Sequence, residues 1–507
     1  MDREQRSQWN CCPSAPRFDA MTRFRKIILG LLVILVALGL FVAWVLRGSP
    51  AEYSLADTTG PKPKLAEPDP QTFPTLGLAK PIGWGANETP VAGKGLVVTR
   101  FADGLDHPRS VVVLANGDVL VAETNAPPSR GPGGLTGLVM NYLFKTVGAG
   151  DPSPNKIVIL RDANHDGKAE QKIVMENPAL NSPFGMVIRE GRLYVANNDA
   201  VVSWPFVAGQ TSLQGKPEKL MDLPAGGMHW VRNMALTPDG QKLYVTVGSS
   251  SNIAENGVDQ ERGRAAIHEY DFAKKSEREY ASGLRNPNGL DFNPRTGELW
   301  TVVNERDMLG SDLVPDYLAS VPLGATFGWP WAYWKKNIDW RVKEPMPDYM
   351  LEYVRKPDYA LGAHTAPLGL AFSRGGNVMG AQFASGAFIA RHGSWNRKPL
   401  SGYDVIFVGF DDRGNVLPNQ PIPVLTGFLT ADGKAKGRPT WVAFAQDGAL
   451  LVSDDTGGVI WRVSSPGAKP AAAIAAIPSG TMPPEGKAGV KYMASPNADS
   501  DLVKPKP

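Results

Sequence analysis

Residues 230–252 read WVRNMALTPDGQKLYVTVGSSSN, an apolar strand, a turn at Gly240 and a second apolar strand. Two apolar runs joined by Pro-Asp-Gly are typical of a β-hairpin. The same pattern begins again at His107, Ser182, Leu284, Ala366 and Arg438. Its turn glycines, 49 to 89 residues apart, are Gly117, Gly191, Gly240, Gly297, Gly386 and Gly448. Each interval can hold one four-stranded sheet, so the repeats predict an all-β fold, a six-bladed β-propeller.

The composition excludes several classes of protein. The 507 residues include 53 Lys and Arg against 50 Asp and Glu, so the net charge is only +3 and gives no indication of a nucleic-acid partner. The only two cysteines, Cys11 and Cys12, precede the repeats. A disulfide framework or a thiolate metal site is therefore impossible in the propeller itself.

Residues 27–46 are apolar or small and carry no charge, and a helix of this length spans a bilayer core. Arg23, Arg25 and Lys26 precede this run, and only Arg47 follows it closely. The positive-inside rule then puts the N-terminus in the cytoplasm and the body outside it. The alternative is a cleaved signal peptide, but the run is long for one and no small-x-small cleavage site follows. We therefore expect a single N-terminal transmembrane helix.

These features divide the chain into five segments. They are a short cytoplasmic N-terminus (1–26), the transmembrane anchor (27–46), a linker and entry segment (47–94), the propeller (95–465) and a Pro/Ala/Lys-rich tail expected to be disordered (466–507). Long insertions at 126–155 and 308–362 interrupt the repeats, and such loops are usually functional. The second contains FGWPWAYWKK (327–336), which is either packing beneath a long loop or the wall of a ligand pocket.

Basic residues recur where the repeats begin or end. His229 stands just before the third repeat, and the arginines at such places are Arg232, Arg285, Arg397 and Arg438. On one face of a propeller they would form a positive cluster. That cluster serves either salt bridges between blades or an anionic ligand held by guanidinium groups.

Other chemical motifs are absent or incomplete. The chain has neither G-x-S-x-G nor H-E-x-x-H. The run DANHDG (162–167) resembles the opening of a calcium loop, but Ile173 stands where such a loop needs its bidentate Glu. We expect a β-turn with Asx hydrogen bonds there.

Five short motifs follow one another in a specific order. They are GLRNPNGL (283–290), NERD (304–307), FGWP (327–330), AHTAP (363–367) and HGSWNR (392–397). Over residues 95–465 the chain resembles the quinoprotein glucose/sorbosone dehydrogenases, six-bladed propellers that use pyrroloquinoline quinone (PQQ) and calcium. It looks most similar to their membrane-anchored sorbosone dehydrogenase branch.

The resemblance implies roles for individual residues. His229 matches the general base, and Arg285 and Asn286 match the segment that contacts the quinone end of PQQ. The implied cofactor contacts are Arg232, Asn286, Arg374, Trp395, Arg397 and Arg438, and the implied calcium site is at Asp307 and the backbone carbonyl of Phe327. The soluble glucose enzymes orient the histidine with an Asp, whereas this chain has Gly248-Ser249. The residue that orients His229 is therefore an open question of the sequence.

The resulting expectation is a PQQ- and calcium-dependent dehydrogenase of an aldose or a sorbosone-like sugar aldehyde. We expect it to be a single-pass protein of a bacterial inner membrane, with a periplasmic catalytic domain that passes electrons to a membrane quinone or cytochrome. Two alternatives stay open. One is a calcium-dependent lactonase-type hydrolase, with candidate ligands Glu123, Asn197, Asn252 and Glu305. The other is a non-enzymatic propeller that binds a glycan or a protein.

Overall fold

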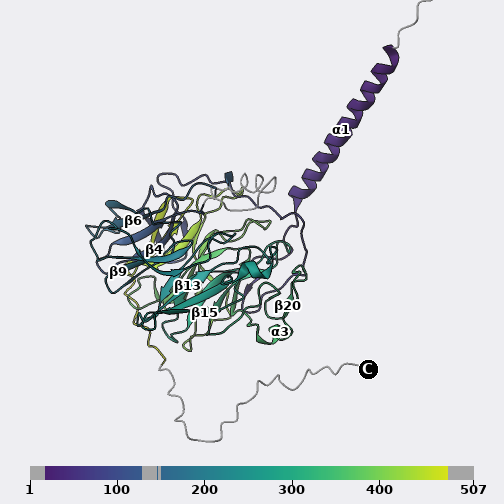
Figure 1. The fold of residues 1–507 in the computed structure, drawn as a ribbon. Coiled ribbons are helices and arrows are strands. Elements are labelled where there is room, and N and C mark those ends of the chain that lie inside the picture. Colours follow the sequence, from purple (N-terminus) through teal and green to yellow (C-terminus); the bar gives the residue numbers. More distant parts are fainter. Residues whose placement is uncertain (1–16, 128–144, 147–149, 478–507) are drawn as a thin grey trace, which may run out of the picture.

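The structure, a computed structural model, describes residues 17–127, 145–146 and 150–477. The described residues form a six-bladed β-propeller with one long helix projecting from it, as predicted (Figure 1). Most of the predicted N-terminal segment 1–26, of the insertion 126–155 and of the tail 466–507 lies outside these residues.

The first three blades are four-stranded antiparallel meanders. The first contains β4 (Pro108–Val113), β5 (Val119–Glu123), β6 (Lys156–Arg161) and β7 (Gln171–Glu176). The second contains β8 (Met186–Arg189), β9 (Arg192–Ala196), β10 (Ala200–Pro205) and β11 (Glu218–Asp222). The third contains β12 (Met234–Leu236), β13 (Lys242–Val247), β14 (Ala266–Asp271) and β15 (Ser276–Ala281), with the short helix η1 (Val258–Glu261) between β13 and β14.

The last three blades each take an outer strand from the N-terminal part of the chain. The fourth is β16 (Asn286–Phe292), β17 (Leu299–Asn304), β18 (Pro315–Ser320) and β21 (Tyr359–Ala363), extended by β1 (Thr59–Gly60). The fifth is β22 (Pro367–Phe372), β23 (Gly386–Arg391), β24 (Asp404–Gly409) and β25 (Ile422–Thr426), extended by β2 (Val91–Ala92). The sixth is β26 (Pro439–Phe444), β27 (Leu450–Asp454), β28 (Val459–Ser464) and β3 (Val97–Ala102), so a strand from before the first blade closes the ring.

Loops and short elements complete the blades. Within the insertion 308–362 lie the two-stranded ribbon β19 (Ala332–Tyr333) and β20 (Asn337–Ile338) and the one-turn helix α3 (Met350–Tyr353). The helix η2 (Ala381–Phe383) precedes β23. Gly386 therefore begins a strand, whereas the other five predicted turn glycines lie in hairpin turns with positive φ, for example 68° at Gly240.

The six innermost strands, β4, β8, β12, β16, β22 and β26, contact one another in sequence around a central channel. Residues at the beginnings of β4, β16 and β22 line one cavity of the channel, and residues toward the ends of β4, β22 and β26 line another. We call the first side the site face and the second the turn face, because the innermost hairpin turns lie there. Between blades the core is apolar: Phe184 of the second blade contacts both Trp230 and Trp441 edge to face.

Residues 48–94 pack on the propeller as an ordered strap instead of spanning free space. Trp84 contacts Phe428 and Trp461 edge to face and donates its indole N–H to Asp454 over 2.7 Å.

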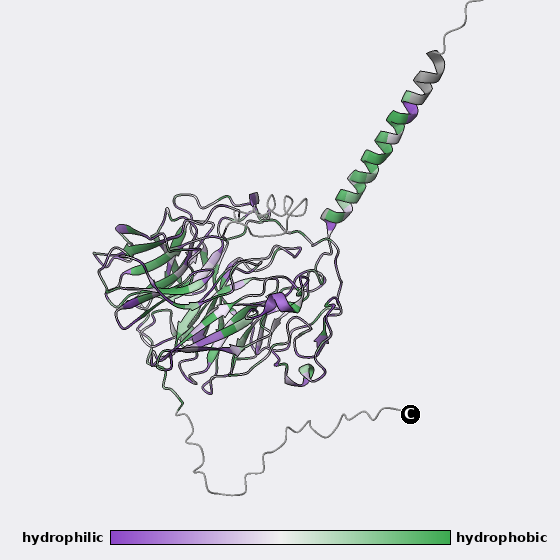
Figure 2. Ribbon diagram, viewed as in Figure 1, coloured by the Kyte–Doolittle hydropathy of each residue, from purple (hydrophilic) through white to green (hydrophobic). Residues whose placement is uncertain are grey.

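Before the strap, α1 (Arg17–Arg47) contains the apolar span Phe24–Val45, none of it buried against the body (Figure 2). By length and composition this helix is long and apolar enough to cross a membrane.

Candidate active site

A cavity of about 280 Å³ opens at the site face, at the start of the central channel. Chemically active side chains from several blades line it: Arg109, His229, Arg285, Asn286, Asn288, Glu305, Asp307, Asp316, His364, His392 and Trp395. They come from the beginnings of innermost strands, from the loops before them and after the second strands, and, for Asp316, from the beginning of the third strand of its blade.

His229 is oriented by the backbone. Its Nδ1 lies 2.9 Å from the carbonyl oxygen of Ser249 and 3.0 Å from the Ser249 hydroxyl, which itself donates to the carbonyl of Ser251. A carbonyl oxygen can only accept, so Nδ1 carries the proton and the neutral ring has its lone pair on Nε2. A Cβ at position 248 would lie 2.6 Å from the Cβ of His229, so a residue larger than glycine at this position would displace the histidine. This geometry answers the question left open by the sequence.

Arg285, Asp307 and His364 form a buried ionic group on one wall. Arg285 donates to Asp307 over 2.8 Å, to the side chain of Asn252 over 2.9 Å and to the carbonyl of Glu305 over 2.6 Å. His364 turns Nδ1 toward Asp307 at 3.4 Å and Nε2 toward the carbonyls of Gly310 and Leu313 at 3.1 Å. Both ring nitrogens thus face acceptors, which is the arrangement of an imidazolium.

The pKa values of this group agree with the geometry. Burial alone would lower the pKa of His364, but Asp307 outweighs it and the pKa is raised. Burial would likewise raise the pKa of Asp307, yet Arg285 and His364 hold it below its usual value. Arg285 and His364 thus both face the Asp307 carboxylate, and Glu305 and Asp316 lie in the same lining.

A second ionic group forms the opposite part of the lining. Asp455 accepts from Arg109 and from Nε2 of His392, each over 2.9 Å. Burial works against the Asp455 carboxylate, but these two partners keep its pKa well below the usual range. Burial, Arg438 and Arg109 lower the pKa of His392. The Nε of Arg109 is buried without a hydrogen-bond partner.

Two amide oxygens in the lining also lack a donor. Asn304 donates its amide N–H to the carbonyl of Pro367 over 2.7 Å, which fixes its orientation because a carbonyl only accepts. Its oxygen then accepts from Asn286 at 3.2 Å and from Asn288 at 3.5 Å. The Oδ1 atoms of Asn286 and Asn288 are left buried and unsatisfied. Such acceptors suit a ligand donor, a water or a hard cation.

The structure brings together half of the residues singled out from the sequence. His229, Arg285, Asn286, Asp307 and Trp395 all line the cavity. The carbonyl of Trp395 also accepts from Gly77 of the strap over 2.8 Å.

Two of the predicted cofactor arginines are engaged elsewhere. Arg374 follows the far end of β22, pairs with Asp291 and lines the cavity of the turn face. The six-residue strand β22 separates Arg374 from the site by about 20 Å. The sequence around Arg374 does not show at which end of the strand it lies. Arg397 is buried and donates to Asp312 and to the carbonyl of Tyr53, so its guanidinium holds the strap.

Three further predicted residues stand behind the cavity wall. Arg232 donates to the carbonyl of His229 over 2.8 Å and so supports the histidine loop; burial lowers the pKa of Arg232 to about 9. Arg438 lies over the ring of Tyr403 at 5.1 Å. Phe327 is buried and stacks on Tyr317, outside the cavity lining.

The structure also shows the surroundings of the aromatic segment 327–336, of the run 162–167 and of the alternative calcium ligands. In FGWPWAYWKK, four of five aromatic side chains are buried and none lines the cavity, which supports the packing interpretation. Gly167 donates its N–H to Asp162 over 2.8 Å, as expected of an Asx turn, although the carboxylates of Asp162, Asp166 and Glu170 also lie close together. Glu123 and Asn197 bind backbone groups of their own blades, while Glu305 lines the cavity.

Sequence reasoning missed Arg109, His392 and Asp455 as one group. The signal for Arg109 was present, since Arg109 begins the first repeat as Arg285 begins the fourth. Its partner Asp455 is more than 340 positions away in the sequence, and no local sequence pattern predicts such a partner.

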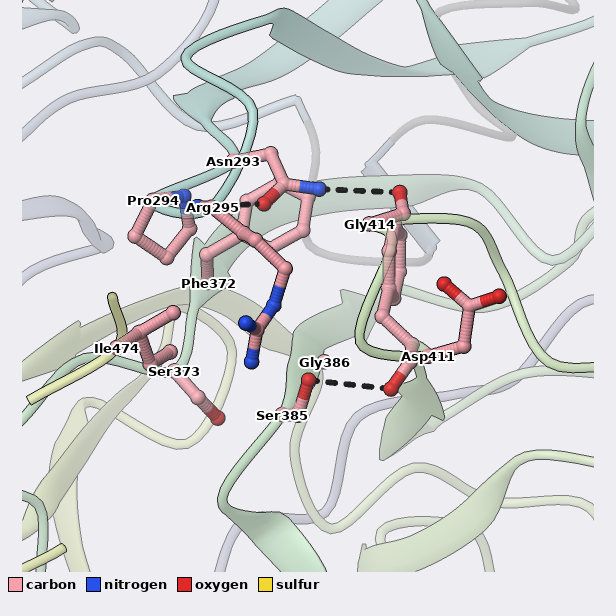
Figure 3. A pocket seen from close by; sticks show the side chains of 11 residues that line it. Asn293, Pro294, Arg295, Phe372, Ser373, Ser385, Gly386, Asp411, Gly414 and Ile474 are labelled. Carbon is pink, nitrogen blue, oxygen red and sulfur yellow. Dashed lines mark hydrogen bonds between the residues drawn. The ribbon is translucent and has the colours of Figure 1, made fainter. Parts of the chain in front are cut away.

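A small pocket at the turn face is not a competing site. It lies where β16, β22 and β24 end, and Asn293 closes it by donating to the carbonyl of Gly414 over 3.2 Å (Figure 3). Its volume of about 10 Å³ is the size of a single water.

Residues 156–315 and 348–466, more than half of the chain, match the model of the TrAA12-like family. The chain belongs to the TrAA12-like family. This match includes His229, Arg285 and Asp307, together with the segment from His364 to Asp455.

The solved relatives have the same fold. The calcium structure of the Trichoderma reesei AA12 protein matches with a TM-score of 0.60 and 18% identity, covering 74% of this chain and 97% of that chain. The holo PQQ domain of pyranose dehydrogenase from Coprinopsis cinerea matches with a TM-score of 0.56 and 20% identity, over 76% and 100%. At these identities the likeness shows the propeller fold.

Two curated relatives were found by sequence. An uncharacterized protein of Borreliella burgdorferi is 29% identical over 306 residues, covering 58% of this chain and 78% of its own length. The PQQ-dependent pyranose dehydrogenase of Coprinopsis cinerea is 25% identical over 437 residues. The match takes in 74% of this chain but only 55% of that enzyme.

Proposed function

We propose that this protein is a membrane-anchored sugar dehydrogenase that uses PQQ and calcium to oxidise an aldose or a sorbosone-like sugar aldehyde. The observation that carries the proposal is the orientation of His229 in a site-face cavity that Arg109 and Arg285 also line. The family and the PQQ-dependent pyranose dehydrogenase relative support the same class of enzyme.

The lining of the cavity fits PQQ, a planar molecule with three carboxylates. Arg109 offers a guanidinium group whose Nε is a donor without an acceptor in the protein. The N–H groups of Arg285 are all taken by protein acceptors, so Arg285 contributes positive charge beside the cofactor and no free donor. Trp395 offers an aromatic surface beside them. For calcium, Asp307 and the unsatisfied Oδ1 atoms of Asn286 and Asn288 are the oxygen ligands of the right kind.

Bound PQQ supplies a two-electron acceptor, and calcium supplies a Lewis acid that polarises it. The protein supplies the proton chemistry. His229 takes the proton of the substrate hydroxyl on Nε2, and Ser249 stabilises the resulting imidazolium through Nδ1–H. The cationic pair Arg285 and His364 stabilises negative charge that develops on that wall.

The cellular setting belongs to the same proposal. The helix α1 holds the propeller at a bacterial inner membrane, with the cavity in the periplasm and the electrons passing to a membrane quinone or cytochrome. Support comes from the apolar span Phe24–Val45 and from the basic residues Arg23, Arg25 and Lys26 at its N-terminal end.

The test is a titration of the full chain with PQQ in the presence of calcium, followed by dye reduction with a panel of sugars. We expect His229→Gln to abolish turnover while cofactor binding, followed by absorbance, is retained, because the amide cannot accept the substrate proton at neutral pH.

The matched control is His165→Gln, in an exposed loop outside the cavity, which should keep full activity. Unchanged turnover in His229→Gln would remove the histidine from the mechanism. A chain that binds no PQQ with calcium present would remove the dehydrogenase assignment.

A calcium-dependent lactonase is the second candidate. The unsatisfied oxygens of Asn286 and Asn288, next to Glu305 and Asp307, favour a cation site that needs no quinone. Lactone hydrolysis that depends on calcium but not on PQQ would identify this activity.

A further inference from the structure

The end of the membrane helix is fixed to the site face. Lys398 donates to the carbonyl of Arg47, the last residue of α1, over 3.4 Å. Two residues later, Ser49 donates its N–H to the hydroxyl of Thr75 over 2.9 Å and accepts from Ser311. Ser311 and Lys398 lie in the loops that follow β17 and β23, whose ends help to form the cavity.

The joint between helix and body leaves no flexible tether. Gly48 is the only residue between the end of α1 and the first hydrogen-bonded residue of the strap. It has φ +61°, and a Cβ there would lie 2.8 Å from the side chain of Thr75. A side chain does not fit at this close contact, so Gly48 packs directly against Thr75 and the helix ends at the surface of the body.

The same part of the strap borders the cavity. Asp69 and Gln71 donate their N–H groups to the carbonyls of Leu309 and Met308, over 3.2 and 3.1 Å. Gly77 donates to the carbonyl of Trp395 over 2.8 Å. Met308 directly follows Asp307, and both Asp307 and Trp395 line the cavity, so residues 69–77 pack against the segments that form this side of the cavity.

This part of the strap also contacts the apolar span of α1. Phe73 contacts Phe41 edge to face, with ring centroids 5.9 Å apart, and 43% of its surface is exposed. Phe41 lies inside the apolar span, about 9 Å along the helix from Arg47. A phenylalanine at this level is positioned for the boundary between lipid headgroups and acyl chains.

We propose that the site face rests on the lipid bilayer, with Phe73 in the interfacial layer and the cavity opening beside the membrane surface. The inference rests on the proposed membrane anchor and deepens it, because it states which side of the propeller meets the lipid. A lipid-dissolved acceptor then reaches the cavity directly from the membrane, whereas the turn face is directed to the aqueous phase.

The test places one fluorescent probe at each end of the same strand. In a background with Cys11→Ser and Cys12→Ser, which removes both native cysteines, Asn256→Cys labels an exposed loop beyond the site-face end of β13. Pro238→Cys labels the exposed turn at the opposite end, about 20 Å away. The full-length chain is reconstituted into liposomes that contain headgroup-spin-labelled lipids, and quenching of each probe is measured.

We expect quenching at position 256 to be several-fold stronger than at position 238. Equal quenching, or stronger quenching at 238, would overturn the inference, as would a chain that does not stay in the liposome fraction. Insertion of a Gly-Ser linker between Arg47 and Gly48 should weaken quenching at 256, because it releases the fixed joint. None of these readouts needs PQQ or sugar, so a failed dehydrogenase assay and a failed membrane contact are distinguishable.

Discussion

At the scale of single residues, Asp454 and Asp455 are neighbours in the chain with opposite electrostatics. Asp455 accepts hydrogen bonds from Arg109 and His392, which keep its pKa lowered. Asp454 is equally buried but accepts only from neutral N–H groups, including those of Trp84 and Arg438. Burial dominates for Asp454 and raises its pKa to about 6. The partners, and not the depth of burial, decide which of the two carboxylates is ionised.

This contrast predicts a pH dependence of stability. Between about pH 4 and pH 6 the folded protein binds a proton at Asp454 more tightly than the unfolded chain does. The free energy of unfolding therefore falls as the pH rises through this range. The contribution of Asp454 to this fall is at most about 3 kcal/mol. Asp454→Asn should remove that part of the slope, because the amide does not titrate. Chemical denaturation in detergent at three pH values would measure it; a variant with the slope of the wild type would contradict the assigned pKa.

Residue types alone predicted part of the site. Arg285 and Asp307 were recognised in the motifs GLRNPNGL and NERD, and His229 by its place just before the third repeat; all three line the cavity. Arg397 was misjudged in its surroundings, because its partners Asp312 and Tyr53 are 85 and 344 positions away. The tautomer of His229 depends on a backbone carbonyl, and a sequence carries no side-chain signal for that contact.

At the scale of elements, the repeats predicted the blades but not their outer edges. Hairpins with a turn glycine identified the innermost pairs, since those pairs are local in the chain. The pairing of β3 with β28 and of β1 with β21 joins segments hundreds of residues apart. The strands β1 and β2 have only two residues each, too few for any period to be visible.

Trp84 is a side-chain contact by which the strap is held to the sixth blade. Trp84→Ala should destabilise the protein by about 2–4 kcal/mol, since it removes two ring contacts and leaves Asp454 with one donor fewer. Trp84→Phe keeps the ring contacts and loses only the N–H, so about 1 kcal/mol is expected. Denaturant titration of both variants would separate the two contributions; equal stability of all three proteins would show that the strap does not contribute.

At the scale of the whole molecule, the segment before the first blade belongs to the folded body. Residues 48–102 contribute β1, β2 and β3 to three successive blades, and they bind the site face through Asp312 and Trp395. A chain that encircles half of a propeller in this way unfolds with it, because none of its parts has a core of its own. The composition of 47–94, rich in proline, alanine and polar residues, predicted a linker with some ordered entry structure, and composition does not report which contacts it makes.

Limited proteolysis would distinguish the two descriptions. A free linker between anchor and propeller would be cut first by thermolysin, at residues such as Leu65 or Leu76, and would release a body that begins near those positions. A bound strap, whose backbone is hydrogen-bonded to Leu309 and Trp395, should survive as long as the blades themselves. Trp84→Ala should accelerate cleavage in the strap ahead of the blades, since it weakens the attachment without touching the innermost strands. Intact-mass measurement over time in detergent would follow both events, and early cleavage between residues 60 and 80 of the wild type would show that the strap is only loosely bound.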